Sequence, residues 1–589
     1  MNLVTSMFLR RMRAPFILVI CAYTVAIIGL ITIPGIDDKG NLWHMNIFQA
    51  FYYVSFTATT IGFGEIPYPL SHAQRLWSLV TIYITVISWF YALGRILTLA
   101  QDKPFREAAT RSRFRRDVRN LDTPFYLVCG FGETGNAVVN SLAEEHFRTV
   151  VIEQDPDNLN ELALNELAEH VPAIAGDASD PDQLELAGIR HPLCRGVIAV
   201  TPSDATNLKI AITSKLLHPD IRVACRSEIK EFADNMKSFN TDYIVNPYET
   251  FADIFAMAMH SPSLHLIYDW LTGSPNTRLS DPIYFRYGHW VLCGYGRFGK
   301  ELFTHLHNRD IPTTIIDSSG EIEAEYNQMV DKNLCTFIRG IGFDAETLKQ
   351  AGIDHAAGLI AGTDNDSNNL SIIMTARAIN PDVFVVARQN LLNNRELYQA
   401  SKANLVMRPR EIIARKIRVL FQTPLLIDYL ALARDRDAEW ANITVSRLSA
   451  VVGEVRPHLW TVLISKKESP AVAQGLNYGR KISLGHLIRD PNARNQKLKC
   501  VPLLLSRDYE QVLMPEDEID IHAFDRILFC GTREVKNSMQ AILNEMSSLN
   551  YVMTLKKEPE SYVWRKLHRH FNREERRSEQ REDEELDHN

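Results

Sequence analysis

The chain has 589 residues, of which 46% are hydrophobic and 23% charged, and its formal net charge is −7. This length predicts roughly three to four domains, and the acidic balance argues against nucleic acid as a partner. The eight cysteines include no Cys-x-x-Cys pair, which predicts buried free thiols in a reducing compartment and argues against a disulfide scaffold or a zinc site.

Two uncharged apolar runs near the N-terminus predict membrane spans. Residues 14–36 are long enough for a hydrocarbon core about 30 Å thick, and residues 76–94 form a second run that ends before Arg95. A secretory signal is the alternative for the first run, which is long for one and lacks a clear cleavage site. Basic residues gather outside the two runs, with only Lys39 between them before Arg75. This bias predicts a multi-pass plasma-membrane protein with both termini in the cytoplasm.

A shorter uncharged stretch, Asn46–Thr60, lies between the spans. It is too short to cross a bilayer and predicts a re-entrant helix. Such a helix ends inside the membrane, where its partly negative C-terminal end favours a cation. The aromatic residues expected to pack it against the spans are Phe48, Phe51, Tyr52 and Phe56.

The end of this stretch leads into a segment that contains Gly62 and Gly64. Pointing successive backbone carbonyls along one axis requires angles that residues with a Cβ resist, and the two glycines supply them. The alternative is an accidental Gly-Phe-Gly turn in a helical hairpin anchor. The segment consists of Thr60, Ile61, Gly62, Phe63 and Gly64.

This segment resembles the selectivity-filter signature Thr-Val-Gly-Tyr-Gly of potassium channels. The resemblance implies four copies of the chain around one pore, with K⁺ bound by backbone carbonyls. Those carbonyls would belong to Thr60, Ile61, Gly62 and Phe63. Phe63 lacks the hydroxyl of the usual tyrosine, and Glu65 replaces the usual aspartate. These departures leave a weakly selective cation channel as an alternative.

Other positions bear on the same resemblance. Tyr52 and Tyr53 stand where relatives often carry paired aromatics that brace the filter, and Phe56 stands at a site that is acidic in some relatives. Gly94 is the only candidate hinge of the second span, with a packing role as the alternative.

From residue 125 onward, apolar strands alternate with helical stretches, which predicts a parallel α/β sheet. The strand at 125–129 leads into Gly-Phe-Gly-Glu-Thr-Gly, and an acidic residue ends the next strand. In such a turn the glycines let a pyrophosphate approach the backbone at a helix N-terminus, while the acid binds ribose hydroxyls. The candidate residues are Gly130, Gly132, Gly135 and Glu153.

The module repeats 164 residues later, which indicates two copies of one fold. The second set of candidates is Gly294, Gly296, Arg297, Gly299 and Asp317. In the first copy Glu133 takes the place of Arg297, and an anion there repels phosphate whereas a guanidinium grips it. The second copy is therefore predicted to be the better site, for NAD, ADP or ATP. The alternative for either copy is that its glycines serve only helix–strand packing.

The two modules are similar to RCK (KTN) domains, the Rossmann-like regulators of potassium conductance. With the pore segment ahead of them, the chain resembles a prokaryotic two-span potassium channel with tandem RCK domains. The resemblance implies a homotetramer in a lipid bilayer, gated by an intracellular small molecule and without enzymatic activity. Glu153 and Asp177 are an alternative site for a divalent cation such as Ca²⁺. A membrane-tethered NAD-dependent oxidoreductase is the remote alternative, which leaves the filter segment unexplained.

The expected fold is an α-helical pore followed by two Rossmann-like α/β domains and a smaller α+β C-terminal lobe. A basic linker joins pore and domains, either to transmit movement or to touch anionic lipid headgroups. The expected boundaries are 1–101 for the pore, 102–123 for the linker, 124–287 for the first RCK domain with a helical crossover, 288–435 for the second, 436–550 for the lobe and 551–589 for a charged tail.

Overall fold

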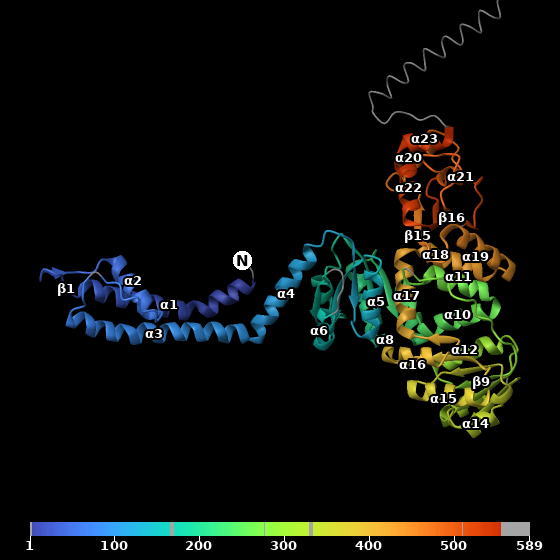
Figure 1. Ribbon diagram of the computed structural model, residues 1–589, viewed down its shortest axis with the longest axis horizontal. Helices are drawn as coiled ribbons and strands as arrows, with labels where there is room; N and C mark the ends of the chain where they lie inside the picture. The colour runs from blue at the N-terminus through green and yellow to red at the C-terminus, as the bar shows by residue number, and fades with distance from the viewer. Residues whose placement is uncertain are drawn as a thin grey trace, which may run out of the picture. The chain divides into compact units, whose positions relative to one another are not determined.

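The computed structural model describes residues 3–66, 68–164, 170–275, 277–328, 334–508 and 510–554 (Figure 1). By its internal contacts the chain divides into two units. The first holds residues 1–123 with the segments Pro172–Gly176 and Glu185–Leu193, and the second holds the rest. From residue 555 on, the expected charged tail lies outside the described residues.

The first unit consists of long helices with a short antiparallel hairpin. Its elements are α1 (Leu3–Thr32), β1 (Gly35–Ile36), β2 (Leu42–Trp43), α2 (Ile47–Ala58), α3 (His72–Gln101) and α4 (Lys103–Arg119). Capping boxes start α2 at Asn46 and α3 at Ser71. Residues 6–32 of α1 and the whole of α3 are long and apolar enough to cross a membrane, so both predicted spans are confirmed as helices.

α1 and α3 approach each other closely at Gly29. A Cβ on Gly29 would lie 2.1 Å from Cε2 of Trp77, so a side chain there would displace the indole. The Trp77 indole N–H donates to the Ala26 carbonyl over 3.2 Å. Gln74 Nε2 donates to the Ile33 carbonyl over 3.1 Å. These bonds satisfy polar groups between the spans and fix the register of one helix against the other.

α2 packs on the spans through part of its surface only. The buried cluster that holds it consists of Ala26, Leu30, Met45, Ala50, Tyr53, Val54 and Phe56. The prediction that Phe48 packs against the spans is wrong, because 73% of this residue is exposed. Phe51 is 50% exposed, but its ring lies 6.5 Å from that of Tyr23 in α1, so it does pack against a span. Phe48 lies on a face of α2 that a single chain leaves open.

The chain contains two α/β copies with the same strand order, and the second unit holds them except for the segments Pro172–Gly176 and Glu185–Leu193 of the first copy. The first copy has β3 (Phe125–Cys129), α5 (Glu133–Ala143), β4 (Arg148–Glu153), α6 (Pro156–Leu164), β5 (Ala173–Ala175), α7 (Pro181–Leu186), β6 (Cys194–Ala199), α8 (Asp204–Leu217), β7 (Arg222–Arg226), α9 (Lys230–Ser238) and β8 (Tyr243–Val245). The second has β9 (Trp290–Cys293), α12 (Arg297–His307), β10 (Thr313–Asp317), α13 (Gly320–Gln328), β11 (Cys335–Arg339), α14 (Ala345–Gln350), η1 (Ile353–His355), β12 (Gly358–Ala361), α15 (Asp366–Ile379), β13 (Phe384–Arg388), η2 (Leu392–Asn394), α16 (Arg395–Ala400) and β14 (Leu405–Met407).

Each sheet reverses its strand order beside its first strand. Among the strands of the second unit the orders are β4-β3-β6-β7-β8 and β11-β10-β9-β12-β13-β14, and the strands pair in parallel. β3 and β9 are buried along their whole length, as expected for strands covered by helices on both faces. Ligands of such sheets bind beyond the carboxyl ends of the strands at the point of reversal, where both glycine turns lie.

Helices that follow each copy pack on the other copy or on the helices that follow it. They are α10 (Pro247–His260) and α11 (Pro262–Thr272) after the first copy, and α17 (Pro409–Gln422) and α18 (Pro424–Arg434) after the second. Phe251 of α10 contacts Phe298 of α12 at a ring distance of 5.6 Å. Phe421 of α17 contacts Tyr126 of β3 at 4.8 Å. This exchange ties the two copies together, and Figure 1 shows α17 running beside α10 and α11.

A repeated Asp/Asn pair holds loops in both copies. Asn207 bridges the Thr201 carbonyl and the Arg226 carbonyl, each over 3.0 Å. Asp204 accepts backbone N–H groups of Glu228 and Ile229 over 2.8 Å. Asn369 and Asp366 make the matching bonds in the second copy. These repeated residues therefore fix the loops that follow the central strands.

The C-terminal lobe is an antiparallel sheet covered by helices. Its elements are α19 (Ala438–Val452), β15 (His458–Leu463), α20 (Pro470–Asn477), α21 (Leu484–Leu487), β16 (Cys500–Arg507), β17 (Glu510–Leu513), β18 (Arg526–Gly531), α22 (Arg533–Asn544) and α23 (Met546–Thr554). The strand order is β15-β18-β16-β17. The pore helices, the paired Rossmann-like sheets and this lobe confirm the predicted fold class.

Glu145, just beyond α5, is the centre of a buried ionic cluster. It lies 2.7 Å from Arg456 Nη1 of the lobe and 3.6 Å from Arg418 Nη1 of α17. Gln422 Nε2 donates to its other oxygen over 2.9 Å. Burial raises the pKa of Glu145, but the arginine and glutamine contacts outweigh it and hold that pKa below its usual value. One carboxylate thus joins the first copy, α17 and the lobe.

Candidate functional site

The predicted filter segment alternates in backbone handedness. Thr60, Gly62 and Gly64 have φ values of 60°, 65° and 71°, whereas Ile61 and Phe63 between them do not have positive φ. Alternation of this kind turns successive peptide groups to the same side, which lines up carbonyls along one axis. Thr60 is β-branched, so its left-handed conformation is a strained one of the kind that concentrates at functional sites.

The filter segment is anchored to the end of α2. The backbone N–H groups of Ile61 and Gly62 donate to the Phe56 carbonyl over 3.0 and 3.2 Å. Phe56 itself is clamped by Tyr52 and Tyr53, at ring distances of 5.4 and 5.3 Å. These contacts fix where the left-handed segment begins.

A second anchor lies beyond the segment. The Tyr52 hydroxyl donates to Glu65 Oε2 over 3.2 Å. The bond joins the middle of α2 to the far end of the filter segment. It supplies a polar brace that Phe63, which has no hydroxyl, does not offer.

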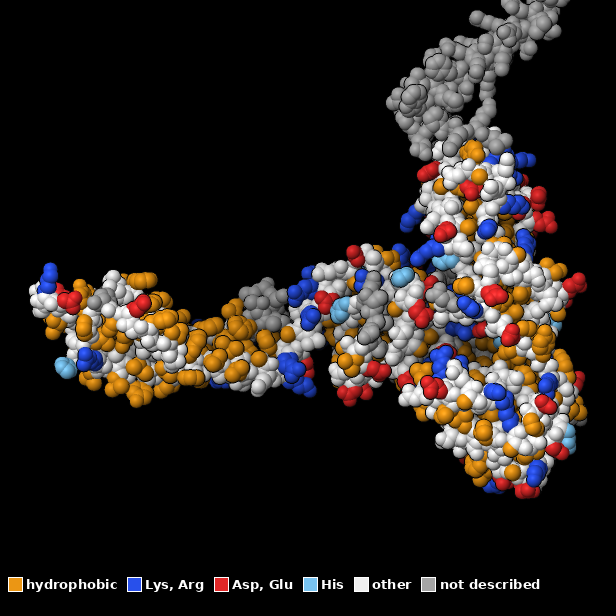
Figure 2. Space-filling view, in the orientation of Figure 1, with side chains coloured by type: hydrophobic (Ala, Val, Ile, Leu, Met, Phe, Trp, Pro, Cys, Tyr) orange, Lys and Arg blue, Asp and Glu red, His pale blue; other side chains and the backbone are white. Residues whose placement is uncertain are grey.

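One copy of the chain leaves the filter segment uncovered. Ile61 is 59% exposed and Phe63 64% exposed. The outward side of α3 is also apolar, and Figure 2 shows hydrophobic side chains over this part of the molecule. Its exposed large residues include Leu76, Leu79, Tyr83, Ile87, Phe90 and Leu97. An exposed apolar surface of this kind marks a site that contacts protein or membrane.

The three glycines of each phosphate turn have different roles. Gly130 and Gly294 have φ values of 95° and 94°, which side chains disfavour. A Cβ on Gly135 would lie 2.0 Å from the Gly130 carbonyl oxygen, and one on Gly299 would lie 2.1 Å from that of Gly294. The fold itself therefore requires the first and third glycines. This is the helix–strand packing role expected as the alternative to phosphate binding.

The middle glycines have no such structural reason. Gly132 and Gly296 have φ values of −67° and −75°, and a Cβ on either would meet nothing within 4 Å. They stand at the starts of α5 and α12, where backbone N–H groups point out of the helix. Open space at a helix N-terminus is what an approaching phosphate needs, so packing alone does not explain these glycines.

The acidic residues Glu153 and Asp317 accept hydrogen bonds from backbone N–H groups of the glycine turns. In the first copy the Phe131 N–H donates to Glu153, and the Asp155 N–H donates to Glu153 Oε1 over 2.8 Å. In the second copy the Tyr295 N–H donates to Asp317 Oδ2 over 2.8 Å. Both carboxylates retain lone pairs beyond these bonds, which is the capacity a ribose diol requires.

The charged residues of the two turns form ion pairs across the copies. Arg297 Nη1 lies 2.6 Å from Glu228 Oε2 of the first copy, and its guanidinium lies 5.4 Å from the ring centre of Tyr248. Glu133 pairs with Arg410 of α17. The opposite charges predicted for the two turns are present, but each is balanced by a residue from the other copy.

Sequence reasoning missed Glu228, Tyr248 and Arg410. Tyr248 and Arg410 occupy matching places, because Pro247-Tyr248-Glu249 and Pro409-Arg410-Glu411 recur at an offset of 162 residues. That offset marked them as equivalent, but only the exchange of α10 and α17 brings each to the turn of the other copy.

The predicted divalent site has less support in one chain. Asp177 Oδ1 accepts the Ser179 N–H over 2.8 Å, and this bond holds its pKa below the usual value. Among the described residues, no group of three or more His, Cys, Asp or Glu side chains is placed to hold a metal ion. A Ca²⁺ site at Glu153 and Asp177 stays a prediction, and it would need further ligands from a second chain.

Two protein families match the chain. The ion channel family matches residues 16–102, and the TrkA-N domain matches residues 126–247 and 290–409. The parts matched by these families are the pore segment and the two α/β copies.

Curated relatives and a solved structure extend these matches. Potassium channel protein 1 of Methanocaldococcus jannaschii is 27% identical over 232 residues, 39% of this chain and 65% of the relative. Probable potassium channel protein 2 of that organism is 27% identical over 208 residues, 35% of this chain and 58% of the relative. The chain thus spans less than two thirds of the length of these relatives. The GsuK channel bound to NAD aligns over 91% of this chain and 100% of that chain, at 14% identity and a TM-score of 0.48.

The family matches agree with the order of elements in the structure. The ion channel match begins within α1 and contains α2, the filter segment and α3, and each TrkA-N match begins within the first strand of a copy. The chain is therefore a membrane protein with an ion channel segment followed by tandem TrkA-N (RCK) domains.

Proposed function

We propose that four copies of the chain form a potassium channel that an intracellular nucleotide gates through the RCK domains. The alternating left-handed residues Thr60, Gly62 and Gly64, placed between two spans, are the observation that carries this proposal. Such a segment presents a row of carbonyls, and rings of carbonyls from four copies replace the hydration shell of K⁺. Both termini lie in the cytoplasm, as the distribution of basic residues requires.

The proposed nucleotide site is the turn of the second copy. Its cation, Arg297, stands on the turn at the N-terminus of α12, whereas the first turn carries an acid there. A ligand phosphate and Glu228 compete for the same guanidinium. NAD and ADP both offer the pyrophosphate and ribose that the turn and Asp317 suit.

This competition supplies a route from ligand to pore. Arg297 belongs to the second copy and Glu228 to the first, so a phosphate that takes Arg297 removes an ion pair between the copies. A ligand shifts a conformational equilibrium only by its differential affinity for the two states, and this exchange is such a difference. Helix α4 follows α3 after a single residue, Asp102, and so connects that movement to the second span.

The test of this function is K⁺ flux through the purified full chain in proteoliposomes, with NAD and ADP added in turn to the face that carries the RCK domains. We expect K⁺ uptake that one of these nucleotides changes severalfold. Flux that neither nucleotide alters would reject gating at the glycine turns by these ligands, and absence of flux in vesicles that contain folded tetramer would reject the channel.

A weakly selective cation channel is the second candidate. It is favoured by Phe63, which lacks the bracing hydroxyl and is 64% exposed in a single chain. Equal Na⁺ and K⁺ flux in the same vesicles would favour it over a selective pore.

A further inference from the structure

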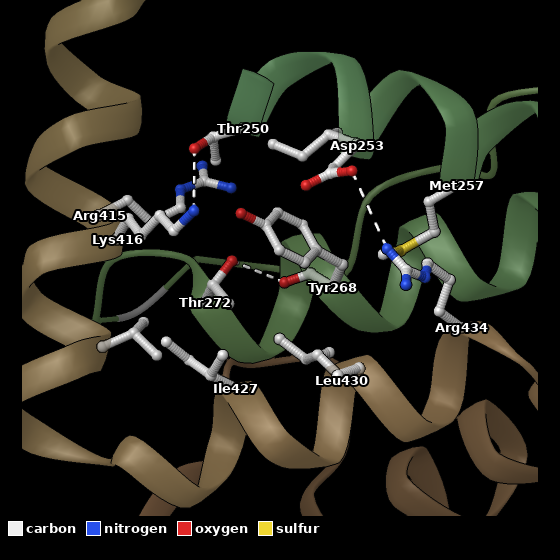
Figure 3. Close-up of a pocket in the computed structure, with 13 residues that line it drawn as sticks. Thr250, Asp253, Met257, Tyr268, Thr272, Arg415, Lys416, Ile427, Leu430 and Arg434 are labelled. Carbon is white, nitrogen blue, oxygen red and sulfur yellow. Dashed lines mark hydrogen bonds and ion pairs between the residues drawn. The ribbon is translucent and has the colours of Figure 1, made fainter. Parts of the chain in front are cut away.

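A cavity of about 160 Å³ lies between the helices that the two copies exchange (Figure 3). Its walls come from α10 and α11, which follow the first copy, and from α17 and α18, which follow the second. None of the residues that line it belongs to a glycine turn. It is therefore distinct from both nucleotide turns.

One part of the cavity wall is apolar. Met257, Val419 and Leu430 line it and are 8%, 4% and 9% exposed. Ile254 and Ile427 extend the same wall. A cavity of about 150 Å³ lined by such side chains is large enough for one benzene ring. The space thus fits a compact apolar body.

The other part of the cavity wall carries the cationic side chain of Lys416. Lys416 Nζ donates to Thr250 Oγ1 over 3.0 Å, which uses one of its three donors. Among the residues that the structure describes, no carboxylate oxygen lies within 4.0 Å of Nζ, although Asp253 and Glu249 act on it from farther away. Burial lowers the pKa of Lys416 against the effect of these acids. A closer anion would compensate this half-buried ammonium.

The other charged residues of the wall already have partners. Arg415 Nη1 lies 2.7 Å from Asp269 Oδ1, and Arg434 Nη1 lies 3.9 Å from Asp253 Oδ1. Figure 3 shows Asp253 directed toward Arg434 and the Tyr268 hydroxyl directed toward the end that holds Lys416 and Arg415. Burial raises the pKa of Tyr268, so the hydroxyl keeps its proton and is available as a donor beside Lys416.

We propose that this cavity binds a small carboxylate with a compact apolar body. The carboxylate lies between Lys416 Nζ and the Tyr268 hydroxyl, and the body lies against Met257, Val419 and Leu430. Charge-assisted bonds of this kind are about twice as strong as neutral ones, which sets the preference for an anion over its amide.

Such a ligand would bridge helices that follow the two different α/β copies of one chain. It contacts α10 and α11 on one side and α17 and α18 on the other, so it stabilises the arrangement of the copies in which these walls are closest. Binding itself rests on the cavity alone and is independent of the proposed ion conduction and nucleotide gating.

The test uses 4-fluorobenzoate as the probe and ¹⁹F NMR of the full chain in lipid nanodiscs. We expect saturable binding, at least tenfold weaker for the neutral isostere 4-fluorobenzamide. Lys416→Met should weaken binding of the acid at least tenfold, since it keeps the length of the side chain and removes the charge. Tyr268→Phe, which removes only one hydroxyl, should weaken it severalfold.

Two further variants locate the probe. Leu430→Trp fills the cavity and should abolish binding, whereas Lys349→Met removes an exposed lysine of α14, outside the cavity and the turns, and should leave binding as it is. Absence of saturable binding to the parent chain would overturn the proposal. Equal binding by the parent and the Lys416→Met and Tyr268→Phe variants would also overturn it, because the probe would then occupy another place or the bilayer.

Discussion

At Gly62 the backbone has a φ of 65°, the conformation on which the proposed ion conduction depends. Gly62→Ala adds a Cβ that disfavours this conformation by about 1–2 kcal/mol. We expect the variant to assemble but to lose K⁺ current in planar bilayers, because the carbonyl row is disturbed. The matched control is Gly40→Ala, since Gly40 also has positive φ (79°) and open space around it but lies in the hairpin loop. Normal current in Gly62→Ala would remove Gly62 from the ion path.

At the second phosphate turn, substitutions of Arg297 and Glu228 should change nucleotide affinity in opposite directions. Arg297→Glu should weaken nucleotide binding at least tenfold, because it replaces the phosphate partner by a repelling charge. Glu228→Gln should tighten binding severalfold, because it removes the competing carboxylate 2.6 Å away. Calorimetry of the purified full chain measures both.

The first copy provides the control for that pair. Glu133→Gln removes the acid of the first turn and its ion pair with Arg410. We expect it to leave nucleotide affinity unchanged. Tighter binding in Glu133→Gln together with unchanged binding in Arg297→Glu would place the ligand in the first copy.

At the scale of elements, the contact between α1 and α3 depends on Gly29. Gly29→Ala places a methyl group against the Trp77 indole, at an overpacking cost of about 1–3 kcal/mol. We expect a lower melting temperature and less tetramer by size-exclusion chromatography.

Gly94→Ala is the comparison within the same helices. A Cβ on Gly94 meets nothing within 4 Å, and α3 continues through this residue. Alanine favours the helix there by about 1 kcal/mol, so stability should be kept or raised, and a change in open probability alone would identify Gly94 as a hinge. Equal losses of tetramer in both variants would contradict the close contact at Gly29.

The sequence predicted the elements better than their partners. The conformations of Gly62, Gly64 and the glycine turns could be predicted because glycine tolerates the angles they need, and strands β3 and β9 because their apolar runs are continuous. The left-handed conformation of Thr60 could not, because a β-branched residue disfavours it. The pairs Arg297–Glu228 and Glu133–Arg410 could not, because they arise from the exchange of α10 and α17 between the copies. The prediction that Phe48 packs against the spans is wrong for a similar reason. One face of its helix, α2, is exposed in a single chain.

At the scale of the whole molecule, Glu145 joins the first copy to α17 and the lobe. Its two arginine partners are 1% and 8% exposed. Glu145→Gln would leave them without a carboxylate and should destabilise the folded chain by about 3–5 kcal/mol. Differential scanning fluorimetry at pH 7 measures the loss.

The same carboxylate predicts a dependence on pH. Its pKa is lower in the folded chain than its unfolded value, which is about 4.3 for a free Glu. The stabilisation is therefore complete above that unfolded value and is lost as the pH falls through the lower folded one. The difference in melting temperature between parent and Glu145→Gln should shrink below about pH 4, and a constant difference down to pH 3 would contradict this role.

The left-handed residues between the two spans are proposed to form a potassium filter. The most direct measurement is the reversal potential of the purified chain in a planar bilayer with KCl on one side and NaCl on the other. The account predicts a shift toward the K⁺ equilibrium potential, by about 59 mV for each tenfold of selectivity. A reversal potential near zero, in a current that Gly62→Ala abolishes, would show a pore through this segment that does not select K⁺ and would contradict the account.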